Sequence, residues 1–399
     1  SDVMGTCLWR LGRKDEARAI WDNLLRQNPN SPYRSLIESC LAGENVDVVN
    51  PDDAETRPQS ARAWRAGDIF WSVDTKAPSF GSAAAGDLDG DGRPEVVFGT
   101  YFNDEHIYTL NGLDGSIAWK AKSIGGPLDA SVLIHDVDRD GKLDVVYGDS
   151  AHGRMFCRHG DGREIWTYDG PSGTDSPPAI ADLDGDGDLE IVYGTMKSRD
   201  GAGHVVVLDA ATGKPVWVVS VAGHVQSEPA LVDLNGDKVL DVLVTNWMVD
   251  DHLRALNGRD GSELWKHPTG DWVYHGVSVD DFDGDQQPEI VVADRKGTVW
   301  MLEGESGKPK WQATLADERQ GMVFAPTTLV DADGVGPKEI VVCGMHVHLL
   351  DAHGKERWTK RYGGRSIARG VTAADLDGDG RNDLCFGQGR TLRALTAAT

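Results

Sequence analysis

Residues 87–95 read Asp-Leu-Asp-Gly-Asp-Gly-Arg-Pro-Glu, and this stretch decides how the rest of the chain is interpreted. Oxygen-bearing side chains stand at loop positions 1, 3, 5 and 9, and a glycine stands at position 6, where the backbone must turn sharply. Ca²⁺ prefers about six to eight oxygen ligands, and this spacing wraps them around one point, together with the backbone carbonyl of position 7. Residues 96–99, Val-Val-Phe-Gly, are typical of a strand rather than of the helix that follows an EF-hand loop. We therefore expect a calcium loop between two strands.

The pattern returns six more times, and successive loops start 44 to 51 residues apart. In the sixth loop Asp331, Asp333 and Glu339 remain, but Val335 stands where the third ligand is expected. A motif that recurs at a nearly fixed period predicts a repeat architecture in which each repeat is one structural unit.

The predicted calcium ligands are the side chains at positions 1, 3, 5 and 9 of the other six loops, with backbone carbonyls at several positions 7. They are Asp87, Asp89, Asp91, Arg93, Glu95, Asp136, Asp138, Asp140, Lys142, Asp144, Asp182, Asp184, Asp186, Asp188, Glu190, Asp233, Asn235, Asp237, Asp241, Asp281, Asp283, Asp285, Glu289, Asp375, Asp377, Asp379, Arg381 and Asp383. Similar sites recur in every repeat, whereas a reaction centre is expected once. We therefore predict several structural Ca²⁺ ions rather than a catalytic one.

Composition agrees with a turn-rich protein and restricts its partners. The 399 residues include 48 glycines and 13 tryptophans, and the formal net charge is −24. Such acidity argues against nucleic acid and anionic membranes as partners. No run of residues is long and apolar enough to predict a membrane span.

Each repeat contains the signals of four strands. Short apolar strands flank the acidic loop, a third strand follows, and the fourth contains a Gly-x-x-x-Trp element. Seven such elements occur, and the first, ending at Trp71, precedes the first loop, while none follows the seventh. Seven four-stranded units predict an all-β, seven-bladed β-propeller over residues 64–399. We expect strand 67–75 to complete the last blade and close the ring.

The first 63 residues lack the strand and loop pattern of the repeats. Residues 1–43 have apolar residues at helical spacing, and residues 44–63 are acidic with two prolines, as in a linker. The segments Leu11 to Ala17 and Asn28 to Pro32 resemble a tetratricopeptide repeat, although they cover little more than one unit. The chain begins with Ser1 rather than Met, which we interpret as a processed or trimmed product.

The repeats can now be compared with known families. Segments such as Gly86 to Gly92 with Phe98-Gly99, and their copies through Phe386-Gly387, resemble FG-GAP (VCBS-type) repeats, the propeller type of integrin α-subunits. The resemblance implies calcium-bearing blades over about residues 64–399. Lys238 and Gln286 depart from it at the loop glycine, so we expect loops one, two, three and seven to bind best, four and five less well, and six poorly.

A second resemblance concerns the tryptophans. Residues 208–217, Leu-Asp-Ala-Ala-Thr-Gly-Lys-Pro-Val-Trp, resemble the tryptophan-docking motif of quinoprotein propellers. In that family the tryptophans lock neighbouring blades together. The motif therefore implies an architecture and not a quinone cofactor.

The face opposite the calcium loops holds the irregular residues. The connections between second and third strands, and those before first strands, are expected there, where such propellers usually bind. Candidate ligand-binding residues on this face are Trp247, between second and third strands, and Trp272, Tyr274, His275 and Arg369, before first strands near the channel mouth. Aromatics mixed with acids and histidines suit a carbohydrate or a peptide. A solvated rim with scattered aromatics is an equally good interpretation.

Three functions remain open. The first is a non-catalytic, calcium-stabilised binding or assembly module outside the cytosol (secreted, periplasmic or on the cell surface), with a protein or glycan partner and a place in a larger assembly. The second is a polysaccharide-active, lyase-like enzyme with a base at the channel mouth, for which His275, Tyr274 and Arg369 are the candidates. The third, a quinoprotein dehydrogenase, is disfavoured because the adjacent cysteine pair frequent in such enzymes is absent.

Overall fold

The computed structural model describes Arg26 and residues 71–79, 81–124, 126–198, 201–248, 252–318, 323–362, 366–367, 370–376, 381–388 and 391–397. The chain divides into two compact units, Ser1–Asp74 and Thr75–Thr399. Apart from Arg26, the predicted helical segment 1–43 and the linker 44–63 lie outside the described residues. No helix in the described part of the chain is long and apolar enough to cross a membrane.

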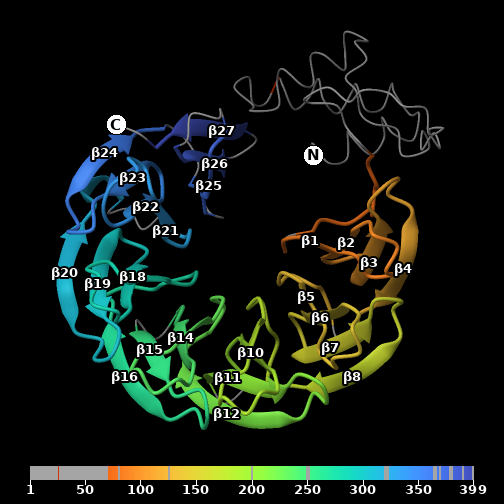
Figure 1. Cartoon of the computed structure of the whole chain (residues 1–399). Coiled ribbons are helices and arrows are strands. Elements are labelled where there is room, and N and C mark those ends of the chain that lie inside the picture. Colours follow the sequence, from red (N-terminus) through yellow and green to blue (C-terminus); the bar gives the residue numbers. More distant parts are fainter. Residues whose placement is uncertain are drawn as a thin grey trace. The chain divides into compact units, whose positions relative to one another are not determined.

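The described residues of the second unit form seven antiparallel sheets, six of four strands and one of three. Each sheet uses consecutive strands in chain order, so each is one blade. Figure 1 shows the blades side by side around a common centre, with the fourth strands of blades one to six at the rim. The all-β propeller predicted from the repeats is therefore confirmed.

The strands of blades one to three follow the acidic repeats closely. They are β1 (Ala84–Gly86), β2 (Glu95–Gly99), β3 (His106–Asn111) and β4 (Ile117–Lys122); β5 (Leu133–His135), β6 (Asp144–Gly148), β7 (Arg154–His159) and β8 (Glu164–Asp169); and β9 (Ala179–Ala181), β10 (Glu190–Gly194), β11 (Ala202–Asp209) and β12 (Pro215–Ala222).

Blades four to seven continue the pattern, with one short 3₁₀ helix, η1 (Ala316–Glu318), after blade five. The strands are β13 (Ala230–Val232), β14 (Asp241–Thr245), β15 (His252–Leu256) and β16 (Glu263–Pro268); β17 (Ser278–Asp280), β18 (Glu289–Ala293), β19 (Thr298–Glu303) and β20 (Pro309–Thr314); β21 (Thr328–Val330), β22 (Glu339–Cys343), β23 (Val347–Leu350) and β24 (Glu356–Lys360); and β25 (Thr372–Ala374), β26 (Asp383–Gln388) and β27 (Thr391–Thr396).

Blade seven has three strands among the described residues. Its predicted fourth strand, 67–75, lies partly outside them, and residues 71–75 form no strand. Closure of the ring by this segment therefore stays a prediction.

The hydrophobic core lies between blades. Each of six buried clusters combines residues from two neighbouring blades. One of them joins Val146 and Met155 of blade two to Tyr193 and Val206 of blade three. The second strands of blades two to six are buried at all five residues, because both of their faces are covered. Such strands read as continuous apolar runs, as Ile-Val-Val does in β18.

Tryptophans connect the rim of each blade to the next blade. The indole N–H of Trp119 donates a hydrogen bond to the carbonyl oxygen of Gly160 at 2.7 Å, and Trp166 donates to Ala210 at 2.8 Å. The tryptophans of blades three to six do the same, at 2.8 to 3.3 Å. The docking role that the quinoprotein resemblance implied is therefore present at six blade junctions.

A β-bulge interrupts the pairing of third and fourth strands at the same place in blades one to six. One residue of the fourth strand, directly before the tryptophan, has no partner in the ladder. These bulge residues are Ala118, Ile165, Val216, Leu264, Lys310 and Arg357.

Candidate functional site

The first acid of each acidic loop organises the turn. In loop three, which joins β9 to β10, Asp182 accepts hydrogen bonds from the N–H groups of Gly185 at 2.8 Å and Gly187 at 3.0 Å. These glycines have φ of +80° and +92°, a conformation that glycine adopts without steric cost. Lys238 and Gln286 occupy position 6 in loops four and five at φ of +68°, and their N–H groups donate to the first acid all the same. Both loops keep their shape, at about 1–2 kcal/mol of backbone strain each.

The last acid of each loop lies beneath the turn. It accepts a hydrogen bond from the N–H of loop position 2 in all seven loops, at 2.8 to 3.2 Å. In loops one and three, carboxylate oxygens at positions 1, 3 and 9 lie within 4.8 Å of one another. Carboxylates that converge in this way form the donor set of a hard divalent cation.

Burial, together with the neighbouring carboxylates, raises the pKa of the acids at position 9 of loops three and four. Burial, followed by the charges of Asp184 and Asp186, raises the pKa of Glu190 to about 7, although the bond from Leu183 opposes this shift. Burial and neighbouring carboxylates also raise the pKa of Asp241 in loop four to about 6. Oδ1 of Asp241 is buried without a hydrogen-bond partner. A cation between these carboxylates would satisfy that oxygen and offset the repulsion, so the residues of loops three and four fit Ca²⁺.

The backbone of position 7 contacts the acid at position 5, and the predicted coordination of Ca²⁺ by the position 7 carbonyl stays a prediction. The N–H groups of Arg93, Lys142 and Asp188 each donate to the carboxylate at position 5, at 2.8 to 2.9 Å. Asp377 and Asp379 of loop seven lie outside the described residues.

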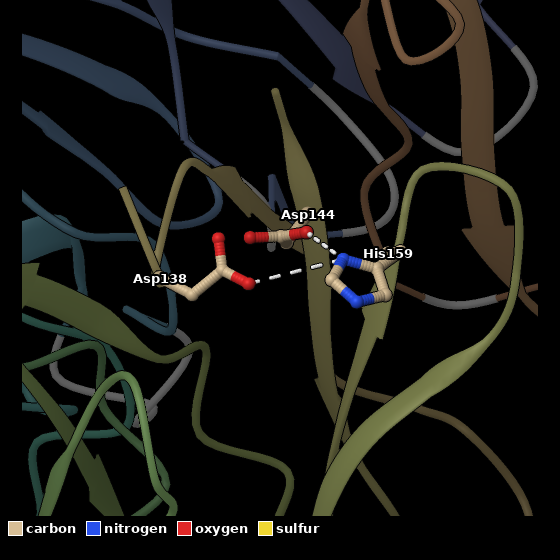
Figure 2. Close-up of side chains that lie close together, drawn as sticks. All are labelled: Asp138, Asp144 and His159. Atoms are coloured by element: carbon tan, nitrogen blue, oxygen red, sulfur yellow. Dashed lines mark hydrogen bonds and ion pairs between the residues drawn. The ribbon is translucent and has the colours of Figure 1, made fainter. Parts of the chain in front are cut away.

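Loop two adds an imidazole to the carboxylates. His159 is the cross-strand partner of Asp144, and its Nδ1 lies 3.2 Å from Asp144 Oδ1 and 4.0 Å from Asp138 Oδ2. Figure 2 shows the three side chains pointing toward one another. Because imidazole suits transition metals and Ca²⁺ prefers oxygen, loop two offers a donor set that differs from that of the other loops. The sequence pattern did not indicate His159, since it lies outside the nine-residue motif.

In loop five a lysine stands among the carboxylates. Lys310 Nζ lies 2.6 Å from Oδ2 of Asp283, at position 3, and 2.8 Å from Oε1 of Glu289, at position 9. Burial alone would lower the pKa of Lys310, but these two hydrogen bonds raise it. The hydrogen bond from Lys310 also lowers the pKa of Asp283.

An arginine takes the same place in loop six. Arg357 Nη1 lies 2.8 Å from Oδ2 of Asp333, at position 3, and 2.7 Å from Oε1 of Glu339, at position 9. The hydrogen bond to Asp333 raises the pKa of Arg357, and it lowers the pKa of Asp333. Sequence reasoning missed both basic residues. A signal for them was present in the sequence. The residue before the tryptophan is basic in two repeats only, and these are the repeats whose loops contain Gln286 and Val335.

Aromatic side chains gather on the opposite face, at blades four and five. The ring of Trp247, after β14, lies 6.4 Å from that of Trp272 and 5.1 Å from that of Tyr274, with both pairs nearly perpendicular. The ring of His275 lies 4.8 Å from that of Tyr274. Four of the five predicted ligand-binding residues are therefore neighbours, and the fifth, Arg369, lies outside the described residues.

The backbone fixes this aromatic face. Trp247 and His224 exchange two backbone hydrogen bonds, at 2.8 and 2.9 Å, and their rings lie 5.6 Å apart. Phe324 adds a ring 6.0 Å from that of Tyr274. We call Trp247, Trp272, Tyr274 and His275 the aromatic face.

A charged group borders the aromatic face. The guanidinium of Arg295 lies 4.6 Å from the ring centre of Trp272, and its Nε lies 2.9 Å from Oδ1 of Asp271. Lys296 Nζ lies 2.6 Å from the other oxygen of Asp271. Burial opposes ionisation of Asp271, but the bonds from Arg295 and Lys296 lower its pKa to about 2. The sequence did not predict this arrangement, because Arg295 comes from the connection after β18.

A small hollow lies beside the aromatic face. Its volume is about 280 Å³, and its lining includes Pro177, Glu228, His275, Gly276 and Pro326. These residues come from the connections before the first strands of blades three to six, so the hollow lies near the inner rim. It brings one imidazole and one carboxylate to the same space.

Comparison with solved structures shows the propeller fold. The structure resembles BamB from Moraxella catarrhalis (18% identical, covering 82% of this chain and 85% of that one, TM-score 0.58). It also resembles the Vibrio cholerae biofilm matrix protein Bap1 (15%, 83% and 81%, TM-score 0.60) and the Bacillus licheniformis rhamnogalacturonan lyase PL11 (16%, 80% and 72%, TM-score 0.55). None of the curated protein sequences compared with the chain matches it.

Comparison with family profiles assigns the repeats. Residues 87–147 match the FG-GAP-like repeat, which confirms that part of the predicted resemblance. Residues 159–370 match the profile described as outer membrane protein assembly factor BamB. Since the second match spans more than half of the 399 residues, the chain belongs to the family of the outer membrane protein assembly factor BamB.

Proposed function

We propose that this protein is a non-catalytic assembly module outside the cytosol, which binds a protein partner through the aromatic face and uses Ca²⁺ as a structural ion. Membership of the BamB family supports an assembly role. The proposal favours a protein over a glycan for that reason, and a glycan remains an outcome of the test below.

The aromatic face is the observation that carries the proposal. Tryptophan, tyrosine and arginine dominate the binding energy of protein interfaces, because they bury a large area with few rotatable bonds. Here Trp247 and Tyr274 are half-buried, and their rings are held by perpendicular contacts. Arg295 lies against Trp272 at the border. A surface arranged before binding loses little side-chain entropy when a partner docks.

Calcium would be held by the acidic loops between first and second strands. The carboxylates at positions 1, 3, 5 and 9 supply the ligands, and the ion supplies positive charge where buried acids converge. Several bound ions would also reduce the formal charge of −24. The aromatic face lies on the other side of the blades, so the ions act on stability and not on the partner.

The test places a photo-crosslinking side chain at Met248, which is 37% exposed and adjoins Trp247. The matched control places it at Val335, which is 76% exposed and lies in loop six on the opposite face. Crosslinking is done in intact cells, and adducts are identified by mass spectrometry. We expect a defined envelope protein at Met248 and not at Val335. Adducts that are absent at Met248, or identical at both positions, would contradict the proposal.

Substitution gives a second measurement. Changing Trp247, Trp272 and Tyr274 together to alanine should abolish the Met248 adduct while calcium-dependent stability hardly changes. If the adduct survives, the partner binds elsewhere. If a glycan array gives specific binding that the triple variant loses, the partner is a glycan.

A lyase-like activity is the second candidate, because the hollow places His275 beside Glu228. An imidazole and a carboxylate at one cavity are suited to proton transfer. The test incubates the purified protein with rhamnogalacturonan and other acidic polysaccharides and follows unsaturated products by ultraviolet absorbance. Activity that His275→Ala abolishes would replace the non-catalytic proposal, and a wild-type protein without activity excludes this candidate for those substrates.

A further inference from the structure

The two basic side chains in the acidic loops make the same contacts. Lys310 in loop five and Arg357 in loop six each bridge the carboxylates of positions 3 and 9, at 2.6 to 2.8 Å. These are two of the positions that would hold a cation in the other loops. The carboxylates of Asp281, Asp283 and Asp285 also converge, so loop five keeps a complete acidic set beneath the lysine.

Both basic residues occupy one structural position. Lys310 lies in the bulge between Pro309 and Trp311 of β20, and Arg357 lies in the equivalent bulge of β24. The bulge residues of blades one to four are apolar: Ala118, Ile165, Val216 and Leu264. Of the six bulges that the structure describes, only those of blades five and six have a basic side chain, and both of these side chains reach the neighbouring acidic loop.

The acid at position 9 is buried in the acidic loops, so its ionised form is stabilised by a nearby positive charge. Glu95 and Glu190 are 4% and 6% exposed, and Glu289 and Glu339 are 2% exposed. Carboxylates buried at this depth are stable when paired. In blades five and six a covalently attached cation already pairs them, whereas the bulges of blades one, three and four offer no such charge.

We propose that Lys310 and Arg357 replace the metal ion of loops five and six, so that these blades are stable without calcium while loops one, three and four depend on it. The inference rests on the calcium binding of the proposed function and adds where in the ring it occurs. It differs from the ranking predicted from the motif alone, which placed loops four and five together, because loop four keeps its metal and loop five has Lys310 in its place.

The first test removes the charge in loop five. Lys310→Met leaves the acidic set at positions 1, 3, 5 and 9 intact, and Lys310→Arg is the matched control that keeps the charge. After dialysis against calcium, bound metal per chain is counted by mass spectrometry. We expect Lys310→Met to bind one more Ca²⁺ than the wild-type protein, and Lys310→Arg to bind the same number.

The second test adds the charge to loop three. Val216, which is 46% exposed, occupies the bulge that corresponds to Lys310. Val216→Lys should bind one Ca²⁺ fewer than the wild-type protein. Its melting temperature should also fall less when EGTA is added. Val216→Met is the control of similar length without charge. This exposed position keeps the inference testable if Lys310→Met fails to fold.

Loop six provides a third comparison. Arg357→Met alone should gain no metal, because Val335 supplies no ligand, whereas Arg357→Met combined with Val335→Asp should gain one ion. If the wild-type protein binds calcium but the counts of Lys310→Met and Val216→Lys both equal the wild-type count, the inference is wrong and the calcium proposal stands. A wild-type protein that binds no calcium overturns both.

Discussion

The indole N–H of Trp217 in blade three donates a 2.8 Å hydrogen bond to the carbonyl oxygen of Gly258 in blade four. The tryptophan is 8% exposed and packs in the cluster shared by these two blades. One side chain therefore supplies both a polar and an apolar contact across the junction. The indole hydrogen bond recurs at the other five blade junctions that the structure describes, so these six junctions share the same contact.

Trp217→Phe should lower the free energy of unfolding by about 1–3 kcal/mol, because it leaves the Gly258 carbonyl without its donor and removes buried ring area. Urea unfolding followed by circular dichroism measures the difference. Val216→Ala, at the exposed neighbouring position, is the control and should change it by less than about 0.5 kcal/mol. Equal midpoints for both variants would mean that the indole does not stabilise the junction.

Gly213→Ala should destabilise more than Gly270→Ala, although both glycines have positive φ, +66° and +79°. A Cβ at Gly213 would lie 2.5 Å from the Trp166 ring, whereas one at Gly270 would meet nothing within 4 Å. Both variants incur about 1–2 kcal/mol of backbone strain, and the overlap at Gly213 adds about 1–3 kcal/mol. Thermal unfolding of the two variants separates these costs. A similar loss in both would show that the close approach is relieved by movement.

Glu318 should make the stability depend on acid pH. It is fully buried in η1 and accepts hydrogen bonds from the N–H groups of Met345 and His346, both at 2.8 Å. Burial alone would raise its pKa, but the bond from His348 and these two N–H groups hold the pKa below its usual 4.5. The folded protein then binds fewer protons than the unfolded chain, so stability present above pH 4.5 is lost as pH falls through the folded-state pKa.

Glu318→Gln should therefore lower the free energy of unfolding by about 2–4 kcal/mol at neutral pH, because an amide replaces the carboxylate that accepts from two backbone N–H groups. The difference in free energy of unfolding between Glu318→Gln and the wild-type protein should become smaller below pH 4.5. Urea midpoints measured from neutral pH down to pH 3.5 give both values. A difference that stays constant over this range would show that folding does not lower the pKa of Glu318.

Chelation should lower the melting temperature. Extracellular calcium modules bind with a Kd of about 10⁻⁴ to 10⁻³ M, and at ten times Kd each independent site adds about 1.4 kcal/mol. Differential scanning calorimetry of the calcium-loaded protein with and without excess EGTA measures the effect, and EGTA saturated with calcium is the control. A protein first shown to contain calcium, yet melting identically in EGTA, would contradict a structural role.

Two deletions test how the ring closes. Removal of residues 64–75 should give aggregation or loss of cooperative unfolding, because it removes the strand predicted to complete blade seven. Removal of residues 1–43 should leave the propeller folded. Light scattering and thermal unfolding compare the two proteins. If they behave alike, another segment closes the ring.

The fold was predictable from local signals that repeat. The acidic loop determines where a first strand ends and a second begins, and Gly-x-x-x-Trp marks the fourth strand with its contact to the next blade. Both signals lie within about ten residues, so their geometry follows from turn chemistry and strand alternation. Because the signals recur, an error in one copy such as Val335 did not disturb the prediction.

The candidate sites were predictable only where a residue acts within its own motif. Trp247, Trp272 and Tyr274 were expected on one face, but the contact of Arg295 with Trp272 depends on how two separate connections of blade five approach each other. Lys310 resembles an ordinary surface lysine in the sequence. Its position over Glu289 follows from a one-residue bulge, and a shift of one residue turns a strand side chain to the other face.

The bulge in the fourth strand makes the identity of one side chain independent of strand pairing. Its residue is outside the ladder, so its identity can change while every strand-pairing hydrogen bond is kept. A protein engineer who wants a propeller for calcium-poor surroundings can thus exchange one codon per blade, starting at Val216 and Leu264, and retain the scaffold. If Lys310 and Arg357 replace the metal ion as proposed, each blade has its own requirement for calcium.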